Sequence, residues 1–490
     1  MSAEMAWLGI DIGTQSVRAL VAAGDGTILA SGQAPLASHR EAGRHEQDPR
    51  QWWEAVGAAC RQAMADIDRN RVAGLAVCGT SGTVLLADQQ LRPLSAGIMY
   101  DDRRATGQVE TVNDIGAALW RRMGYGRMQP VWALPKILWL TADAAPDALV
   151  FHQADFITSL MAGQRTAADT SNALKSGCDL VTEDWDGALI AALGLDPIVL
   201  PRLVRPGTEI GRVCMESAAH CGLRPGTPIL AGMTDGCAAQ LGSGAVTVGS
   251  WNSVLGTTLI LKGTSPALIP DDSGAVYSHR SPLGEWLPGG ASSSGAGAIA
   301  RLLPGLDPDA LEAAAAARPL PLPAYPLASE RGERFPFTAA EAEAFFLEPA
   351  MQDDAVDGYH ALAVGIAAME RLCFDHVEQL GFPTHGQIAV SGGAVRSRFL
   401  TQLRADMLGR ELIVPGVAEP ALGMAVLAAA SQVGLHQAGA SMVRRGKVVE
   451  PSPARQQQCF DRYGALVIAL QQRGWLPARL AAHAKGKINR

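Results

Sequence analysis

The sequence has 490 residues, of which 48% are hydrophobic and 18% charged, and its formal net charge is −7 at pH 7. This composition excludes a wholly disordered chain, and the length predicts two or three domains. The acidic balance argues against a general nucleic-acid binder. The eight cysteines form no CxxC pair, which indicates reduced thiols and neither a zinc site nor a disulfide framework.

The N-terminal residues show no basic region followed by an apolar core, and no uncharged apolar stretch is long enough to cross a bilayer. We therefore expect a cytoplasmic protein with no signal peptide and no membrane partner. The sequence leaves the oligomeric state open, with a homodimer among the options.

Residues 5–20 predict a β-hairpin. An apolar run ends in Asp11-Ile12-Gly13-Thr14-Gln15-Ser16, and a second apolar run begins at Val17. Backbone N–H groups in such a turn can bind phosphate oxygens, and a carboxylate such as Asp11 can hold hydrated Mg²⁺. An ordinary hairpin with a glycine in its turn explains the same residues equally well.

The next elements extend the sheet and add a helix. Residues 27–32 predict a third strand, which gives an antiparallel meander. Asp48 followed by Pro49 is typical of a helix start, and the apolar spacing predicts a helix over 49–68. Strands predicted at 72–78 and 84–87 flank the polar turn Gly79-Thr80-Ser81-Gly82-Thr83.

Charged and polar residues follow these strands. Ile98-Met99-Tyr100 leads into Asp101-Asp102-Arg103-Arg104, which indicates a strand end at a polar cleft, although a solvated loop is the alternative. Residues 105–165 predict mainly helix, and residues 169–173 predict a polar loop.

A strand predicted at 228–231 is followed by Gly232-Met233-Thr234-Asp235-Gly236 and then by a helix of small residues. Asp235 therefore lies at a strand-to-helix junction, where ligand-facing residues of α/β folds gather. A helix N-cap would by itself also explain an aspartate at this position.

A second hairpin is predicted at 250–261, where an apolar strand meets Gly256-Thr257-Thr258 about half a chain after the first hairpin. Similar hairpins at this separation suggest a duplicated domain. A strand at 276–279 follows, and Gly289-Gly290-Ala291 precedes a helix start rich in serine and glycine.

The last third of the chain alternates helices and strands. The pattern predicts a long amphipathic helix at 354–380, a strand at 387–391 that ends in Gly392-Gly393-Ala394, a strand at 412–415 and a helix at 419–430. Residues 455–490 predict one or two surface helices and a frayed basic tail.

Taken in this order, the motifs resemble those of the FGGY carbohydrate kinases, which belong to the actin-like ATPase superfamily. Residues 11–18 fit the family's first phosphate motif, residues 256–258 its second, residues 391–394 its adenosine motif, and residues 234–236 the segment with the catalytic aspartate. The resemblance covers roughly residues 5–435. It implies an α/β fold of two ribonuclease-H-like (actin-like ATPase) domains, 1–244 and 245–490, with a cleft between them.

The resemblance also implies roles for single residues in an ATP- and Mg²⁺-dependent sugar kinase. Asp235 would be the general base and Asp11 would hold Mg²⁺, while Arg18 would either neutralise developing charge or pair with an acidic neighbour. The residues implied to contact the nucleotide are Gly13, Thr14, Gln15, Gly256, Thr257, Thr258, Gly297, Gly392, Gly393, Ala394 and Arg396. Those implied to contact the sugar are Thr80, Ser81, Asp101, Arg103 and Asp235.

Within the family, segments at 151–155, 171–175, 276–280 and 332–336 look like those of D-ribulokinase-like proteins of plants and cyanobacteria. Typical bacterial xylulokinases carry Gly-Gln-Met-His-Gly where this chain has residues 78–82, and a Trp where it has Tyr100. We therefore expect D-ribulose as the substrate, then D-xylulose, with gluconate, glycerol or another polyol less favoured. Arg396 replaces the family's frequent Asn, and its guanidinium can stack on a base.

Two other classes of protein compete with this interpretation. Actin and chaperone ATPases share the superfamily but need a polymer interface or a peptide-binding domain, and no extra domain is visible after residue 435. A binding-only sugar sensor is the third option. The presence of both Asp11 and Asp235 argues against it.

Overall fold

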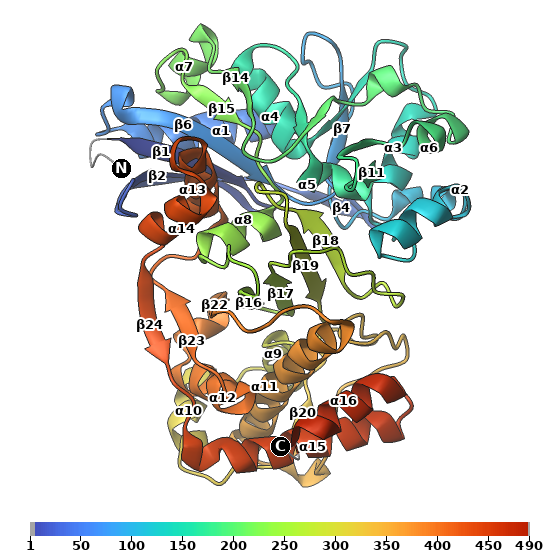
Figure 1. Cartoon of the computed structure of the whole chain (residues 1–490), viewed down its shortest axis with the longest axis vertical. Coiled ribbons are helices and arrows are strands. Elements are labelled where there is room, and N and C mark those ends of the chain that lie inside the picture. The colour runs from blue at the N-terminus through green and yellow to red at the C-terminus, as the bar shows by residue number, and fades with distance from the viewer. Residues whose placement is uncertain (1–4, 489–490) are drawn as a thin grey trace. The chain divides into compact units, whose positions relative to one another are not determined.

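The computed structural model describes residues 5–488, which divide into two compact units (Figure 1). The first unit contains the chain up to Val246 together with Ser278–Leu287 and Val417–Arg444. The second contains Thr247–Tyr277, Pro288–Gly416 and the chain from Arg445 on. Two segments from the later part of the chain thus belong to the first unit. The boundary between two functional domains after residue 244 stays a prediction.

The main sheet of the first unit has the strand order β14-β15-β6-β1-β2-β3. These strands are β1 (Ala6–Ile12), β2 (Ser16–Ala23), β3 (Ile28–Pro35), β6 (Val72–Gly79), β14 (Glu209–Arg212) and β15 (Pro228–Leu230). Strands β1, β6 and β15 run parallel, while β2 and β3 continue antiparallel and confirm the predicted meander. The carboxyl ends of the three parallel strands therefore meet at one edge of the sheet.

The opening hairpin has the predicted form. Asp11 lies opposite Arg18 and Ile12 opposite Val17 in the antiparallel register of β1 and β2. The turn is closed by the Gly13 N–H, which donates to the Ser16 carbonyl at 3.1 Å. All seven residues of β1 are buried, so the strand anchors the turn firmly.

Helices cover both faces of this sheet. The helices of the first unit are α1 (Pro49–Met64), α2 (Val109–Met123), α3 (Ala133–Thr141), α4 (Gln153–Ala162), α5 (Thr170–Ala173), α6 (Gly187–Ala192), α7 (Met215–Cys221), α8 (Asp235–Gly242), α13 (Pro420–Val433) and α14 (Leu435–Met442). Alternate side chains of β1 pack into two cores, one with α1, α4 and α7 and the other with α8, α13 and α14. Asp48 caps α1 as predicted, since its carboxylate accepts a hydrogen bond from the Arg50 N–H.

Short strands complete the first unit. They are β4 (His39–Glu41), β5 (Arg44–Gln47), β7 (Val84–Ala87), β8 (Gly97–Ile98), β9 (Leu149–His152), β10 (Ala168–Asp169), β11 (Cys178–Asp179), β12 (Asp184–Trp185) and β13 (Leu203–Val204). Five of them form a second sheet in the order β4-β5-β8-β7-β9. This sheet carries the polar segments at 79–83 and 99–104 beside the hairpin β4–β5.

The second unit contains three neighbouring parallel strands, β16, β22 and β23, within the order β17-β16-β22-β23-β24. The remaining strands of the chain are β16 (Trp251–Leu255), β17 (Leu259–Gly263), β18 (Tyr277–Arg280), β19 (Trp286–Ala291), β20 (Ala324–Tyr325), β21 (Phe345–Phe346), β22 (Ile388–Ser391), β23 (Leu412–Pro415) and β24 (Arg445–Val449). The hairpin β16–β17 confirms the predicted second hairpin.

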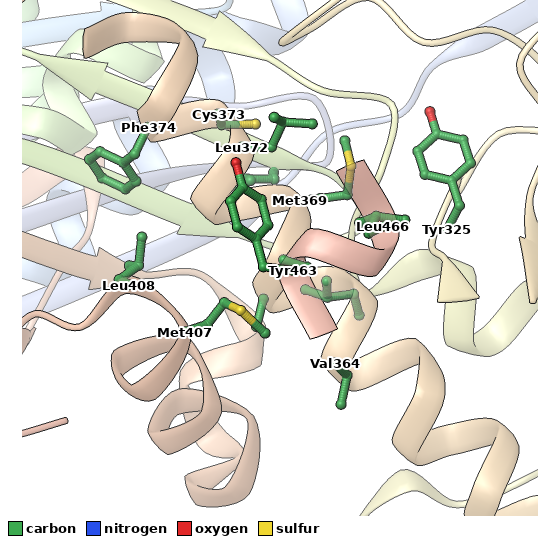
Figure 2. Close-up of a cluster of buried hydrophobic side chains, with 14 of the residues drawn as sticks. Tyr325, Val364, Met369, Leu372, Cys373, Phe374, Met407, Leu408, Tyr463 and Leu466 are labelled. Carbon is green, nitrogen blue, oxygen red and sulfur yellow. The ribbon is translucent and has the colours of Figure 1, made fainter. Parts of the chain in front are cut away.

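The core of the second unit is built around a long helix. Its helices are α9 (Gly297–Leu302), α10 (Pro308–Ala316), α11 (Ala355–Leu380), α12 (Arg398–Leu408), α15 (Pro453–Gln472) and α16 (Ala478–Ile488). Figure 2 shows Met369, Leu372 and Phe374 of α11 in the cluster that also contains Met407 and Tyr463. Glu370 and Arg404, both fully buried, form a two-pronged ion pair that joins α11 to α12.

Several elements differ from the prediction. Residues 170–173 form the short helix α5 instead of a loop, because the Asp169 carboxylate caps it. Gly289 and Gly290 lie inside β19, and β9 interrupts the region predicted as mainly helical. The basic tail is the packed helix α16 up to residue 488, with Lys487 paired to Asp375 and Glu378; residues 489–490 lie outside the described part.

All eight cysteines are free thiols. Within residues 5–488, no helix is both long enough and apolar enough to span a bilayer.

Candidate active site

The first part of the site lies where β1, β6 and the segment after β15 end side by side. Asp11 is opposite Cys78 in the parallel register of β1 and β6, and the Cys78 thiol donates to the Asp11 carboxylate at 3.4 Å. A β-bridge joins Gly79 to Thr234, which directly precedes Asp235. This topology brings together residues that are more than 200 positions apart in the sequence.

Asp11 lies in an environment that disfavours its charge. Burial and, second, the negative charge of Asp235 raise its pKa to about 6, although the Cys78 hydrogen bond and Arg18 act in the opposite direction. The electrostatic effect of Asp235 shows that the two carboxylates are close enough to interact. A divalent cation beside Asp11 would relieve this penalty, so the residues present fit the predicted Mg²⁺.

Asp235 is the first residue of α8, and Thr234 rather than Asp235 is the N-cap. The alternative explanation of Asp235 as a helix cap is therefore wrong. Its carboxylate accepts a hydrogen bond from the Gly236 N–H at 2.8 Å, and it lies in the first turn of α8. Such a carboxylate can accept a proton.

Residues behind Asp235 fix its position. The Thr234 N–H donates to the Ser171 hydroxyl at 3.2 Å, and that hydroxyl also lies 3.3 Å from the Nδ1 atom of His279. All three side chains are buried. Ser171 and His279 had been noted only as parts of segments that resemble a branch of the family, and this supporting role follows from the structure alone.

The turn of the first hairpin lines an open pocket of about 730 Å³. Its lining residues are Asp11, Gly13, Thr14, Gln15, Ser16, Arg18, Gln33 and Pro35. Arg18 is exposed and forms no ion pair within residues 5–488, so its predicted pairing with an acidic neighbour is not observed. A pocket that contains a turn of backbone amides, a carboxylate and a guanidinium suits a phosphate with its metal ion.

The turn between β6 and β7 contributes Thr80 and Ser81. The Thr80 hydroxyl and N–H both donate to Gln153 at 2.9 Å, while the buried Ser81 hydroxyl has no hydrogen-bond partner in the described chain. The buried ammonium of Lys136 donates to the carbonyls of Gly82 and Met99, and its pKa is lowered to about 7, mainly by burial. Lys136 thus fastens this turn to the loop before Asp101.

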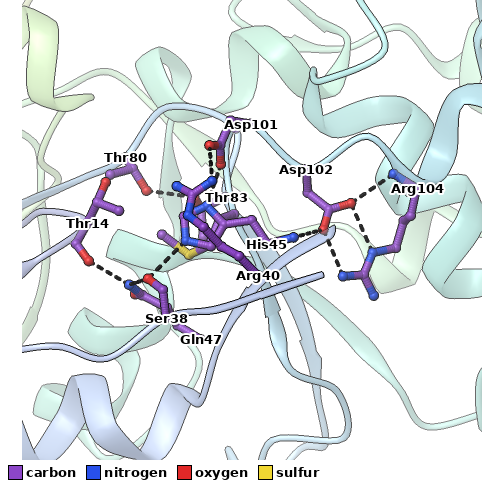
Figure 3. Close-up of polar contacts among 12 residues, drawn as sticks. Thr14, Ser38, Arg40, His45, Gln47, Thr80, Thr83, Asp101, Asp102 and Arg104 are labelled. Carbon is purple, nitrogen blue, oxygen red and sulfur yellow. Dashed lines mark hydrogen bonds and ion pairs between the residues drawn. The ribbon is translucent and has the colours of Figure 1, made fainter. Parts of the chain in front are cut away.

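The loop after β8 carries a tyrosine and the predicted Asp101. Arg40 and His45 both contact the Asp101 carboxylate, at 2.9 and 2.5 Å, and they hold its pKa below the ordinary value despite partial burial (Figure 3). Burial raises the pKa of Tyr100, and the charges of Asp101 and Asp235 raise it further. Tyr100 therefore lies near both carboxylates.

Arg103 is the predicted sugar-binding residue that the structure supports least. Its side chain is exposed, and among the described residues only its backbone forms hydrogen bonds, with Gly43 and Thr106. The neighbouring Asp102 is fully buried and is paired with Arg104 at 2.7 Å.

In the second unit, the predicted nucleotide residues gather at the carboxyl ends of β16 and β22. Val254 and Ser391 are opposite each other in the parallel register, so the turn at 256–258 and the 3₁₀ helix Gly393–Arg396 leave the sheet at the same edge. The Gly297 N–H donates to the Thr257 carbonyl at 3.0 Å. Gly392 has a φ of 90°, and a Cβ there would lie 2.5 Å from the Leu255 carbonyl oxygen, so the position requires glycine.

Glu333 organises the loop that precedes α9. Its buried carboxylate accepts hydrogen bonds from the hydroxyls of Ser292, Ser294 and Tyr325 and from the Ser293 N–H. This loop is paired with Leu259, next to Thr258. Glu333 was noted from sequence only for its resemblance to a family segment.

Family models of the FGGY carbohydrate kinases match the N-terminal domain at residues 6–242 and the C-terminal domain at residues 252–432. A xylulose kinase of Streptomyces rubiginosus is 29% identical over 94% of this chain and 95% of its own, and one of Streptomyces coelicolor is 30% identical over 89% and 90%. The crystal structure of a xylulose kinase from Rhodospirillum rubrum shares the fold, with a TM-score of 0.84 at 24% identity over 95% of this chain and 99% of that one. The chain belongs to the FGGY family of carbohydrate kinases, phosphotransferases with the actin-like ATPase fold.

Proposed function

We propose that the protein transfers the terminal phosphoryl group of ATP to a hydroxyl of a ketopentose, with Asp235 as the general base. The observation that carries this proposal is the position of Asp235, which directly follows the Gly79–Thr234 bridge and whose charge raises the pKa of the buried Asp11 at the end of the parallel strands. Family membership supports a sugar hydroxyl as the acceptor.

In the proposed mechanism, the Asp235 carboxylate accepts the proton of the attacking sugar hydroxyl. The sugar oxygen then forms its bond to phosphorus while the bond between that phosphorus and the bridging oxygen of ADP breaks. Proton acceptance by a well-placed base is worth about two to four powers of ten in rate. Thr234, Ser171 and His279 keep Asp235 in place during this step.

The phosphates are assigned to two backbone turns. We assign the terminal phosphates to the amides and hydroxyls of Gly13, Thr14 and Gln15, and further nucleotide contacts to the segments 256–258, 297 and 392–396 of the second unit. Asp11 would hold Mg²⁺, which neutralises phosphate charge when it is bound. Arg18, exposed in the same pocket, is free to face the phosphates.

The sugar is assigned to the polar segments of the first unit. Thr80, Ser81 and Asp101 provide short polar groups near Asp235, and the Ser81 hydroxyl lacks a partner that a sugar hydroxyl would supply. Arg103 remains in this proposal as an exposed side chain at the same loop. The names of the relatives support D-xylulose, whereas the sequence differences at residues 78–82 and at Tyr100 favour the predicted D-ribulose.

The Asp235→Asn variant tests the mechanism. We expect turnover to fall by about two to four powers of ten, while binding of a non-hydrolysable ATP analogue changes by less than about threefold. The exposed Asp66→Asn variant is the matched control and should retain full activity. Near-normal turnover of Asp235→Asn would overturn the assignment of the base.

A further inference from the structure

His45 lies at the centre of a hydrogen-bond network that the proposed mechanism does not use. It lies on β5, and its side chain is 1% exposed. Its Nδ1 atom is 2.5 Å from Asp101, and its backbone N–H donates to Asp102 at 2.6 Å. Figure 3 shows His45 bonded to both consecutive carboxylates, to Asp101 through its ring and to Asp102 through its backbone nitrogen. One residue thus holds both acidic side chains of the loop after β8.

The chemistry of Asp101 and Gln47 fixes the direction of the hydrogen bonds that they form. An ionised carboxylate only accepts, so the Nδ1 atom of His45 carries the proton that is donated to Asp101. The other ring nitrogen, Nε2, is hydrogen-bonded to the Ser38 hydroxyl at 2.9 Å. The Ser38 oxygen in turn accepts from the Gln47 amide nitrogen at 2.9 Å.

Gln47 connects this network to the turn at residues 13–15, which is called the phosphate turn below. The indole N–H of Trp52 donates to its amide oxygen at 2.7 Å, which fixes the orientation of the amide. The amide nitrogen therefore points the other way and donates to the Thr14 carbonyl at 2.7 Å. Gln47 is 3% exposed and Trp52 is fully buried, so solvent does not compete for these bonds.

We propose that His45 is a positioning residue that orients Asp101 for the sugar and, through Ser38 and Gln47, couples the sugar loop to the phosphate turn at Thr14. The inference rests on the proposed assignment of Asp101 to the sugar and of Thr14 to the phosphates. Without His45, the partly exposed Asp101 keeps Arg40 as its one side-chain partner among the described residues, and the Arg40 side chain, 56% exposed, is a poor anchor.

The first test compares sugar KM and kcat at saturating Mg-ATP. His45→Leu should raise the KM for the preferred ketose about tenfold, the effect of losing one charge-assisted hydrogen bond, with kcat changed by less than about threefold. His45→Asn keeps an N–H donor near the Nδ1 position and should restore part of the affinity. His39→Leu, an exposed residue of the same hairpin, should behave as wild type.

A double variant separates positioning from general damage. If His45 acts through Asp101, the His45→Leu/Asp101→Asn enzyme should have the same KM as Asp101→Asn alone. The inference would be overturned if the double variant raised KM by the product of the two single effects, or if His45→Leu left KM unchanged. Wild-type enzyme that phosphorylates no sugar would instead contradict the proposed function, so the two failures are distinguishable.

The coupling is tested by binding. In the wild type, the ketose should tighten binding of a non-hydrolysable ATP analogue, and Gln47→Glu, which keeps the Trp52 acceptor but cannot donate to Thr14, should reduce this effect at least threefold. An undiminished effect of the ketose in Gln47→Glu would show that the network does not carry the coupling.

Discussion

At the scale of single residues, the site contains charged groups whose burial lowers the free energy of unfolding. Asp11 loses hydration and faces Asp235, and its pKa rises to about 6. The Lys136 ammonium is buried without a carboxylate partner and bonds only to two carbonyls among the described residues. Such groups reduce stability, and they persist where they position a ligand or a loop.

The lowered pKa of Lys136 should be visible in the pH dependence of the free energy of unfolding. Its folded pKa of about 7 is below its ordinary value of 10.5, so between these pH values the unfolded chain binds more protons and stability rises with pH. From pH 7 to 9, the free energy of unfolding of the wild type should gain up to about 1.4 kcal/mol per pH unit relative to Lys136→Met.

Urea unfolding at several pH values measures this difference. The exposed Lys447→Met variant should keep the wild-type slope, because its side chain stays in solvent in both states. Equal pH slopes for Lys136→Met and the wild type would show that the buried ammonium does not titrate as described.

Sequence could predict that Asp11 and Asp235 lie near the ends of strands, because Asp11 directly follows one strand-like run and Asp235 follows another after the short segment 232–234. It could not predict His45, whose partner Asp101 lies 56 positions later on another strand connection. It also could not show that Arg103 is exposed while Asp102 is buried, because adjacent charged residues look alike until the loop is folded.

At the scale of elements, α8 is held in place by a close helix contact. A Cβ at Gly423 of α13 would lie 1.8 Å from the Ala238 carbonyl oxygen of α8, so the two backbones touch. A Cβ at Gly9 of β1 would likewise lie 1.8 Å from the carbonyl oxygen of Ala421 in α13. Glycine in α13 and β1 therefore sets how α8 presents Asp235 at the sheet edge.

Gly423→Ala should destabilise the protein by about 1–3 kcal/mol or more, because the methyl group forces α13 away from α8. Activity should fall as well, since α8 carries Asp235. Gly187→Ala is the matched control and should change stability by less than about 0.5 kcal/mol, because no described atom beyond the chain neighbours and the helix's own backbone lies within 4 Å of the added Cβ. Thermal unfolding and turnover together measure both effects, and a Gly423→Ala enzyme equal to wild type would contradict the packing argument.

The pattern of apolar residues predicted most long elements, including both hairpins, α1 and α11. Burial on one face gives α1 a clear helical period, whereas α11, predicted as amphipathic, is buried on every side from Gly358 to Val377. It missed β9, which is four residues long, and α5, whose start depends on a cap by Asp169. The sequence did not assign Gly289 and Gly290 to a strand, because their role, close approach to neighbouring backbone and to Phe335, is a tertiary property.

At the scale of the whole molecule, the order of segments along the chain does not match their division into two compact units. Residues 278–287 and 417–444 belong to the first unit although they follow strands of the second. His279 and α13 reach the Asp235 region through these two segments. A division of the sequence into two halves could not foresee this, because no local signal marks a segment that returns.

Hydrogen exchange should therefore respond to each ligand in a defined set of segments. The ketose alone should slow exchange at residues 79–83 and 99–103 of the first unit, and an ATP analogue should slow it at 256–258 and 392–396 of the second and at 13–15 of the first. Protection by the ketose that is confined to the second unit would contradict the assignment of the sugar residues.

The most direct test of the central claim is ADP release measured with a panel of ketoses, polyols and aldonates. We predict strong release that depends on a ketopentose, D-ribulose or D-xylulose, and its loss by about two to four powers of ten in Asp235→Asn. ADP release that is equal with and without sugar, or a clear preference for glycerol or gluconate, would contradict the proposal.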